Sequence, residues 1–126
     1  MSYPKELKYT KDHEWIKVDG KTAIIGITDY ALEQLGDVVH VELPEEGDEV
    51  EAGSTFGTIE STKTVSDLYM PATGKVVAVN SDIEDNLETL SESPYDKGWL
   101  VKVEFANLGD DLISAEAYEA FISEDD

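Results

Sequence analysis

Two strand-like runs meet at one short turn in residues 54–70, STFGTIESTKTVSDLYM. Residues 54–60 and 65–70 are rich in β-branched and apolar side chains, which favours extended backbone in both runs. The turn between them, residues 61–64, carries Lys63 near its centre. Because a hairpin tip holds its side chains away from the sheet, the pattern predicts an exposed lysine between two paired strands.

Lys63 is isolated among the basic residues of the chain. All nine basic residues are lysines, and between Lys21 and Lys75 no other lysine occurs. Its neighbours in the turn are small and hydroxylated: Ser61, Thr62 and Thr64. An enzyme that acylates one chosen lysine needs such an exposed, rigid and sterically open position. The position in a turn, taken by itself, favours the interpretation that Lys63 is an ordinary solvated lysine. The motifs around it determine whether it is instead a modification site.

The rest of the chain predicts short strands with two helical segments. Residues 14–18 alternate, with Trp15 on one face and Ile16 on the other, and Asp19-Gly20 is a hairpin signal before a return strand at 22–27. Further strands are expected at 37–43, 75–79 and 99–105, with a turn at 71–74 and loops of some helical character over 81–92.

Capping residues predict where the two helices begin and end. Thr28 and Gly36 suit the ends of a helix over 29–35. Ser114 suits the start of a helix from Ala115 to about Ile122. Its expected apolar stripe consists of Ala117, Tyr118, Phe121 and Ile122.

Many short strands with regular turn signals predict a mainly β fold, either a sandwich or a partly open barrel with peripheral helices. No linker or shift in composition divides the chain, so we expect a single domain over residues 1–126.

Composition excludes several classes of function. The chain has no cysteine and only His13 and His40 as imidazoles, which disfavours a metal centre. A formal net charge of -20 repels nucleic acids and anionic membranes. No apolar run reaches the length of a membrane span. We expect a cytoplasmic protein, or a mitochondrial matrix protein if a transit peptide has been removed.

Specific motifs surround the lysine. The run Gly57-Thr58-Ile59-Glu60-Ser61-Thr62-Lys63 resembles the lipoylation signature, in which Glu-Ser precedes one residue and the modified lysine. Biotin carriers place the lysine between two methionines, which Thr62 and Thr64 do not match. Further motifs, in the same order along residues 7–122, resemble the H proteins of the glycine cleavage system: His13-Glu14-Trp15, Gly26-Ile27-Thr28-Asp29-Tyr30-Ala31, Leu35-Gly36-Asp37-Val38-Val39, Ser93-Pro94-Tyr95 and Ala115-Glu116-Ala117-Tyr118.

The resemblance implies a lipoyl-domain-like barrel-sandwich hybrid with short peripheral helices, one of them at the C-terminus. It implies a carrier without catalytic residues or a metal, with lipoate joined to Lys63 by an amide bond and Glu60 and Ser61 recognised by the lipoylating enzyme. The arm would take an aminomethyl group from a pyridoxal-phosphate-dependent glycine decarboxylase to a tetrahydrofolate-dependent aminomethyltransferase. Dihydrolipoamide dehydrogenase would then reoxidise it. A carrier that exposes its arm to successive partners is expected to be a monomer.

The resemblance also implies a shelter for the carried amine. Glu14 and Asp67 are the expected shelter residues, with Asp12 nearby, because carboxylates suit a cationic amine. His13 could shuttle a proton, but a structural role is the preferred hypothesis. The family commonly has Val and Ala beside the lysine; the small threonines here leave room for modification.

Other functions remain open at this point. An H-like protein could relay lipoyl groups to other lipoylated enzymes, which also requires Lys63. A lipoyl domain of a 2-oxoacid dehydrogenase complex is disfavoured by the His13-Glu14-Trp15 segment and the terminal helix. An enzyme is disfavoured because no nucleophile–base constellation is present. A purely structural protein would leave Lys63 unmodified.

Overall fold

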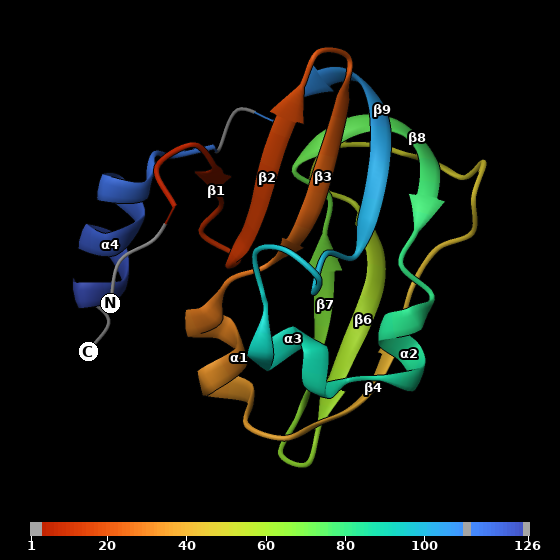
Figure 1. Cartoon of the computed structure of the whole chain (residues 1–126). Helices are drawn as coiled ribbons and strands as arrows, with labels where there is room; N and C mark the ends of the chain where they lie inside the picture. The colour runs from red at the N-terminus through yellow and green to blue at the C-terminus, as the bar shows by residue number, and fades with distance from the viewer. Residues whose placement is uncertain (1–3, 110–111, 125–126) are drawn as a thin grey trace.

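The computed structural model describes residues 4–109 and 112–124. Within them the chain forms two antiparallel sheets and short helices (Figure 1). The six-stranded sheet has the order β1-β2-β3-β9-β8-β5, and the three-stranded sheet has the order β4-β6-β7. This architecture confirms the predicted mainly β class with peripheral helices.

The strands are β1 (Lys8–Tyr9), β2 (Glu14–Asp19), β3 (Thr22–Ile27), β4 (Val38–Glu42), β5 (Glu49–Val50), β6 (Thr55–Ser61), β7 (Val65–Tyr69), β8 (Ala72–Val79) and β9 (Val101–Leu108). The helices are α1 (Asp29–Leu35), α2 (Asp82–Asp85), α3 (Glu88–Glu92) and α4 (Ala115–Glu124).

The predicted alternation of β2 places its side chains on two different cores. Ile16 pairs with Ile25 and faces the main core between the sheets, where β3, β9 and β6 contribute further aliphatic side chains. Trp15 pairs with Gly26 on the opposite face and joins a second cluster with Tyr9. One strand therefore connects the central core to the outer cluster.

The second cluster lies under α4, beside β1 (Figure 1). Tyr118 is fully buried there, as the predicted stripe requires, and Ser114 accepts the N–H of Ala117 as the expected cap. Ala117 itself is exposed, so its predicted place in the stripe was wrong. Ala115 is buried instead, because it lies three residues before Tyr118 and therefore on the same buried face of the helix.

The predicted turn at 71–74 was wrong. Ala72 and Thr73 already pair with β9, opposite Leu108 and Asn107. The local sequence favours a turn, but pairing with β9 keeps this segment extended. Gly74 marks a register shift in the ladder, and a Cβ there would lie 2.5 Å from the carbonyl oxygen of Glu104. The glycine therefore serves a close backbone approach rather than a turn.

Helix α1 follows its prediction at both ends. The Thr28 hydroxyl accepts the N–H of Ala31 at 3.3 Å, and the N–H of Gly36 donates to the carbonyl of Leu32 at 3.1 Å. Leu32 and Leu35 face the core. Residues 81–92, which were expected to be loops with some helical character, form the two short helices α2 and α3. Strand β9 begins at Val101, two residues later than the predicted start at Trp99.

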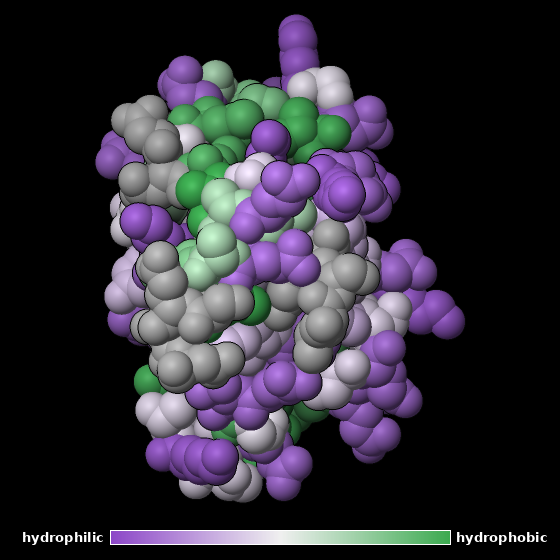
Figure 2. Space-filling model, turned by 90° about the vertical axis from the view of Figure 1, so that its left-hand side faces the viewer, coloured by the Kyte–Doolittle hydropathy of each residue, from purple (hydrophilic) through white to green (hydrophobic). Residues whose placement is uncertain are grey.

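The surface is dominated by hydrophilic side chains, as the acidic composition requires. Figure 2 shows this on the side that carries α4, where a smaller hydrophobic group is exposed among them. No helix of the described residues is long and apolar enough to span a membrane.

Candidate functional site

A tight turn at the end of the β6–β7 hairpin presents Lys63 (Figure 1). The Ser61 N–H donates to the carbonyl of Thr64 at 2.8 Å. The Ser61 hydroxyl oxygen accepts the N–H groups of Lys63 and Thr64 at 3.1 and 3.2 Å. Ser61 is only 5% exposed, whereas Lys63 is exposed. A buried serine thus satisfies the turn amides and fixes the conformation that displays the lysine.

The tip is also tied to the segment between α1 and β4. The N–H of Thr62 donates to the carbonyl of Asp37 at 3.0 Å. The Lys63 side chain passes Gly36, where a Cβ would lie 3.5 Å from Cε and 3.6 Å from Nζ of the lysine. Gly36 has a φ of 81° and ends α1, so glycine suits this position. The lysine side chain therefore runs beside the last turn of α1.

Glu60 and Ser61 lie in different environments although they are adjacent. Glu60 is exposed on the outer face of the three-stranded sheet, between His40 of β4 and Val65 of β7. Ser61 points inward and holds the turn. The Glu60 side chain is accessible to a docking enzyme. Ser61 is buried, so it can affect such an enzyme only by fixing the conformation of the tip.

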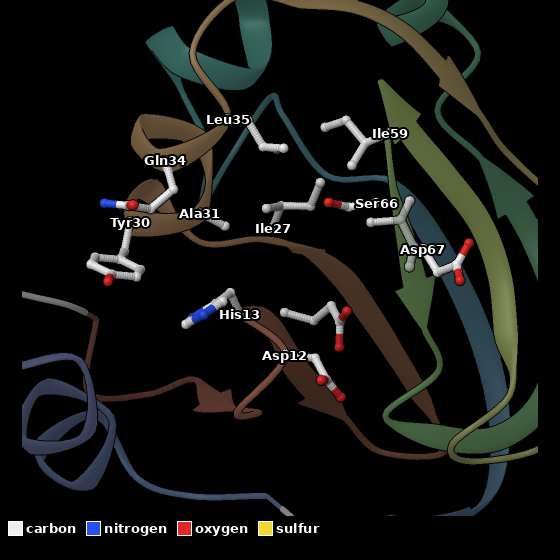
Figure 3. A pocket seen from close by; sticks show the side chains of 12 residues that line it. Asp12, His13, Ile27, Tyr30, Ala31, Gln34, Leu35, Ile59, Ser66 and Asp67 are labelled. Atoms are coloured by element: carbon white, nitrogen blue, oxygen red, sulfur yellow. The ribbon is translucent and has the colours of Figure 1, made fainter. Parts of the chain in front are cut away.

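A cavity of about 280 Å³ opens between α1, the start of β2 and β7 (Figure 3). One part of its lining is aliphatic and comes from Ile27, Leu35, Ile59 and Leu68. Leu35 lines this cavity, and the next residue, Gly36, lies beside the Lys63 side chain. Of the site residues predicted from sequence, the two expected shelter residues, Glu14 and Asp67, line this cavity, and Lys63, Glu60 and Ser61 do not.

Glu14 is a buried carboxyl group at the polar end of the cavity. Its side chain is 2% exposed. The Thr10 hydroxyl donates to Glu14 Oε1 at 2.9 Å, and the Tyr69 N–H donates to Oε2 at 3.1 Å. The Glu14 N–H in turn donates to the Thr10 hydroxyl oxygen at 3.1 Å. These contacts hold the carboxyl group in one orientation.

Burial raises the pKa of Glu14 to about 8. The hydrogen bonds from Tyr69 and Thr10 lower its pKa and nearby Asp12 raises it, but desolvation dominates. At neutral pH the group is mainly a neutral acid. It can give its proton to an amine that enters the cavity, and the resulting carboxylate and ammonium attract one another.

Asp67 and Asp12 lie at the rim rather than inside the cavity. Asp67 is exposed and pairs with Thr58 on the outer face of the sheet. Figure 3 shows its carboxylate turned away from the centre of the cavity. Asp12 is exposed as well. Both side chains are solvated, so water and salt screen their electrostatic effect on the cavity.

His13 is held by the protein on several sides. Its backbone has a φ of 69°, its N–H donates to the Thr10 carbonyl at 3.1 Å, and its carbonyl accepts the Thr28 N–H at 2.9 Å. Its Nδ1 lies 2.8 Å from the Tyr118 hydroxyl, and its ring centroid lies 5.0 Å from that of Tyr30. These contacts support the structural role preferred for His13.

Several lining residues were missed by the prediction from sequence. Tyr30 and Gln34 come from α1 and Ser66 from β7. The helical spacing of Tyr30 and Gln34 was a usable signal, because residues four apart share a helix face. Ser66 and Thr10 gave no such signal. No group of three His, Asp or Glu side chains in the described parts of the chain could hold a metal ion.

Comparison with known proteins agrees with the resemblance to glycine cleavage H proteins that the sequence motifs indicated. Residues 7–125 match the family model described as Glycine cleavage H-protein. The chain is 56% identical over 126 residues to the glycine cleavage system H protein of Staphylococcus haemolyticus, covering 98% of this chain and 100% of the relative. It is 54% identical over 127 residues to that of Anoxybacillus flavithermus, covering 99% and 100%.

A solved structure is also similar. The crystal structure of a glycine cleavage system H protein from Mycobacterium marinum matches with a TM-score of 0.91 and 42% identity, covering 96% of this chain and 99% of that one. This match confirms the lipoyl-domain-like fold expected from the resemblance. The motifs around Lys63, the fold and the full-length relatives agree, and the chain belongs to the glycine cleavage H-protein family.

Proposed function

We propose that this protein is the lipoyl carrier of a glycine cleavage system, with lipoate in amide linkage to Lys63. One observation supports the proposal most strongly. An exposed lysine on a fixed tip runs beside Gly36, and the preceding residue, Leu35, lines a cavity that contains a buried carboxyl group. Family membership supports the same role.

The residues present fit a lipoyl arm. Its aliphatic part suits the apolar wall made by Leu35, Ile59 and Leu68, and Glu14 supplies a polar end. When bound, the lipoyl group supplies a disulfide that can accept an aminomethyl group and be reduced. Amide formation removes the positive charge of Lys63, which eases its movement from solvent into the partly apolar cavity.

The residues of the chain then position and protect the cargo, the aminomethyl group. Ser61 holds the tip, and the bond from Thr62 to Asp37 joins it to the end of α1. The apolar wall reduces access of water, which limits hydrolysis of the cargo. Glu14 shares one proton with the amine, and Asp67 at the rim adds negative potential.

A single arm serves successive partners in this role. These are the pyridoxal-phosphate-dependent glycine decarboxylase, the tetrahydrofolate-dependent aminomethyltransferase and dihydrolipoamide dehydrogenase. The tether keeps the reactive end at a high effective concentration for each docked partner. The lipoylating enzyme would recognise exposed Glu60 directly and Ser61 through the turn that it builds.

Glycine-dependent loading in a reconstituted system tests this proposal. Lipoylated protein is incubated with the decarboxylase and labelled glycine, and incorporation of label is measured by intact mass spectrometry. Wild type and a Lys75→Arg variant should load equally, because Lys75 is an exposed lysine on β8 far from the tip in sequence. Lys63→Arg should not load. Label on Lys63→Arg, or none on wild type, contradicts the proposed role.

A further inference from the structure

The C-terminal helix contacts His13, a cavity-lining residue, through the rings of Tyr118 and Phe121 and through the Tyr118 hydroxyl group. We propose that Tyr118 of α4 is a positioning residue, whose hydroxyl group fixes His13 and the start of α1 in the arrangement that shelters the cargo. The inference rests on the proposed carrier function, which it deepens. It extends the shelter beyond the carboxylates to the helix farthest along the chain.

The hydroxyl group of Tyr118 lies between two parts of the cavity wall. It is 2.8 Å from His13 Nδ1 and 2.7 Å from Thr28 Oγ1. Tyr118 and Thr28 are each 0% exposed. His13 lines the cavity directly, and Thr28 caps the helix that contributes Tyr30 and Ala31 to the lining.

One arrangement of hydrogens satisfies this chain of contacts. The Thr28 hydroxyl accepts the Ala31 N–H at 3.3 Å and donates to the oxygen of Tyr118. The Tyr118 hydroxyl then donates to Nδ1 of His13, which requires a neutral imidazole protonated on Nε2. The reverse direction would leave the Thr28 hydrogen in a buried site to find another acceptor. In this arrangement His13 is the Nε2–H tautomer.

The ring of Tyr118 is fixed independently of its hydroxyl group. It stacks on Tyr9 with centroids 5.0 Å apart and planes 13° apart. The ring of His13 packs edge-on against Tyr118 at 5.8 Å. Replacing Tyr118 by Phe keeps this aromatic packing and removes only the hydrogen bonds, so the two contributions can be separated.

Tyr118 acts through other residues, because it does not itself line the cavity. His13 and Thr28 are joined by a backbone bond of 2.9 Å, and the tyrosine adds a side-chain bond to each. Without it the His13 ring can turn away from Tyr30, and the wall beside Glu14 loosens. Figure 3 shows His13 and Tyr30 facing one another on the side of the cavity where α4 lies.

The test compares Tyr118→Phe with Tyr9→Phe in the full-length, lipoylated and aminomethyl-loaded protein. Tyr9 is an equally buried tyrosine of the same cluster, but its hydroxyl group donates to the carbonyl of Pro4 at 2.7 Å. Loss of the cargo in the absence of partners is followed by mass spectrometry. Tyr118→Phe should lose it at least about fivefold faster than wild type, because both hydrogen bonds of the hydroxyl group are lost. Tyr9→Phe should lose it at the wild-type rate.

Two further measurements keep the inference testable. In the unloaded protein, nitrogen NMR should show the neutral Nε2–H tautomer of His13 in wild type and a shifted Nδ1 signal in Tyr118→Phe but not in Tyr9→Phe. Thr28→Ser, which keeps the hydroxyl group, should retain the cargo longer than Thr28→Ala.

The outcomes distinguish failure of the Tyr118 positioning role from failure of the proposed carrier function. If wild type cannot be loaded with glycine-derived carbon, the carrier function fails, and the NMR comparison still decides the role of Tyr118. If wild type loads and Tyr118→Phe retains its cargo as long as wild type, the positioning role is wrong. Equal acceleration in both tyrosine variants would also overturn it, because it indicates general loosening of the cluster.

Discussion

The β6–β7 tip and the Glu14 cavity are built by contacts of very different range. At the tip, the Ser61 hydroxyl binds the N–H of Thr64, three residues away. In the cavity, Glu14 binds the N–H of Tyr69, 55 residues away, and His13 meets Tyr118, 105 residues away. The turn that displays Lys63 is therefore held mainly by local contacts, whereas the Glu14 cavity depends on contacts between distant parts of the chain. Substitutions in the two regions should have separable effects.

The largest expected effect concerns Glu14 and pH. Its folded pKa of about 8 lies above its ordinary value of 4.5, so the folded protein binds this proton more tightly than the unfolded chain. The corresponding stability is fully present below about pH 4.5 and is lost as the pH rises through about 8. Over this window wild type should lose about 4 kcal/mol more unfolding free energy than Glu14→Gln, which stays neutral.

Urea denaturation at a series of pH values measures this difference. The two stability curves should converge towards acid pH and diverge as the pH rises. Parallel curves would show that the pKa of the Glu14 carboxyl group is not raised. The cavity would then not differ from the exposed tip by holding a neutral, buried acid.

The next largest effect concerns retention of the cargo. Glu14→Ala removes the buried carboxyl group that faces the amine, so the loaded protein should release its aminomethyl group about ten- to hundredfold faster. Lipoylation of Lys63 should stay unchanged. Glu104→Ala, which removes an exposed carboxylate from β9, is the matched control and should behave as wild type. Equal release rates for both variants would remove Glu14 from the shelter.

A tip variant should give the reverse pattern. Ser61→Ala deletes the acceptor of two turn N–H groups, so the tip loosens and the rate of lipoylation should fall about fivefold. Cargo on the lipoylated fraction should be retained normally. Thr62→Ala removes a hydroxyl group from an exposed neighbour and serves as control. Faster cargo loss in Ser61→Ala would show that the two regions are coupled.

The smallest effect is expected at the rim. Asp67 is solvated, so Asp67→Asn should speed cargo loss by less than about threefold, and added salt should abolish the difference. Release rates at low and high ionic strength check this. An effect as large as that of Glu14→Ala would mean that the Asp67 carboxylate turns into the cavity when the arm is loaded.

The same contrast explains what could be predicted from the sequence. Helix α1 was predicted from its cap residues Thr28 and Gly36, and the β6–β7 hairpin from two strand-like runs on either side of the turn at residues 61–64, because these signals act within a few residues. Burial of Glu14 was not predictable, since it needs Thr10 and Tyr69 to converge on one carboxyl group.

The errors have the same cause. Residues 71–74 have a turn-like composition, yet pairing with β9 keeps residues 72–74 extended. Tyr9 lies between the polar residues Lys8 and Thr10, yet it is fully buried against the ring of Tyr118. In each case a partner distant in sequence overrides the local preference.

Peptide-level mass spectrometry of the natively expressed protein tests the central claim most directly. We expect one lipoyl group on Lys63 and none on the other eight lysines. A protein that stays unmodified in cells that lipoylate other proteins, or that carries the group on a different lysine, would contradict it.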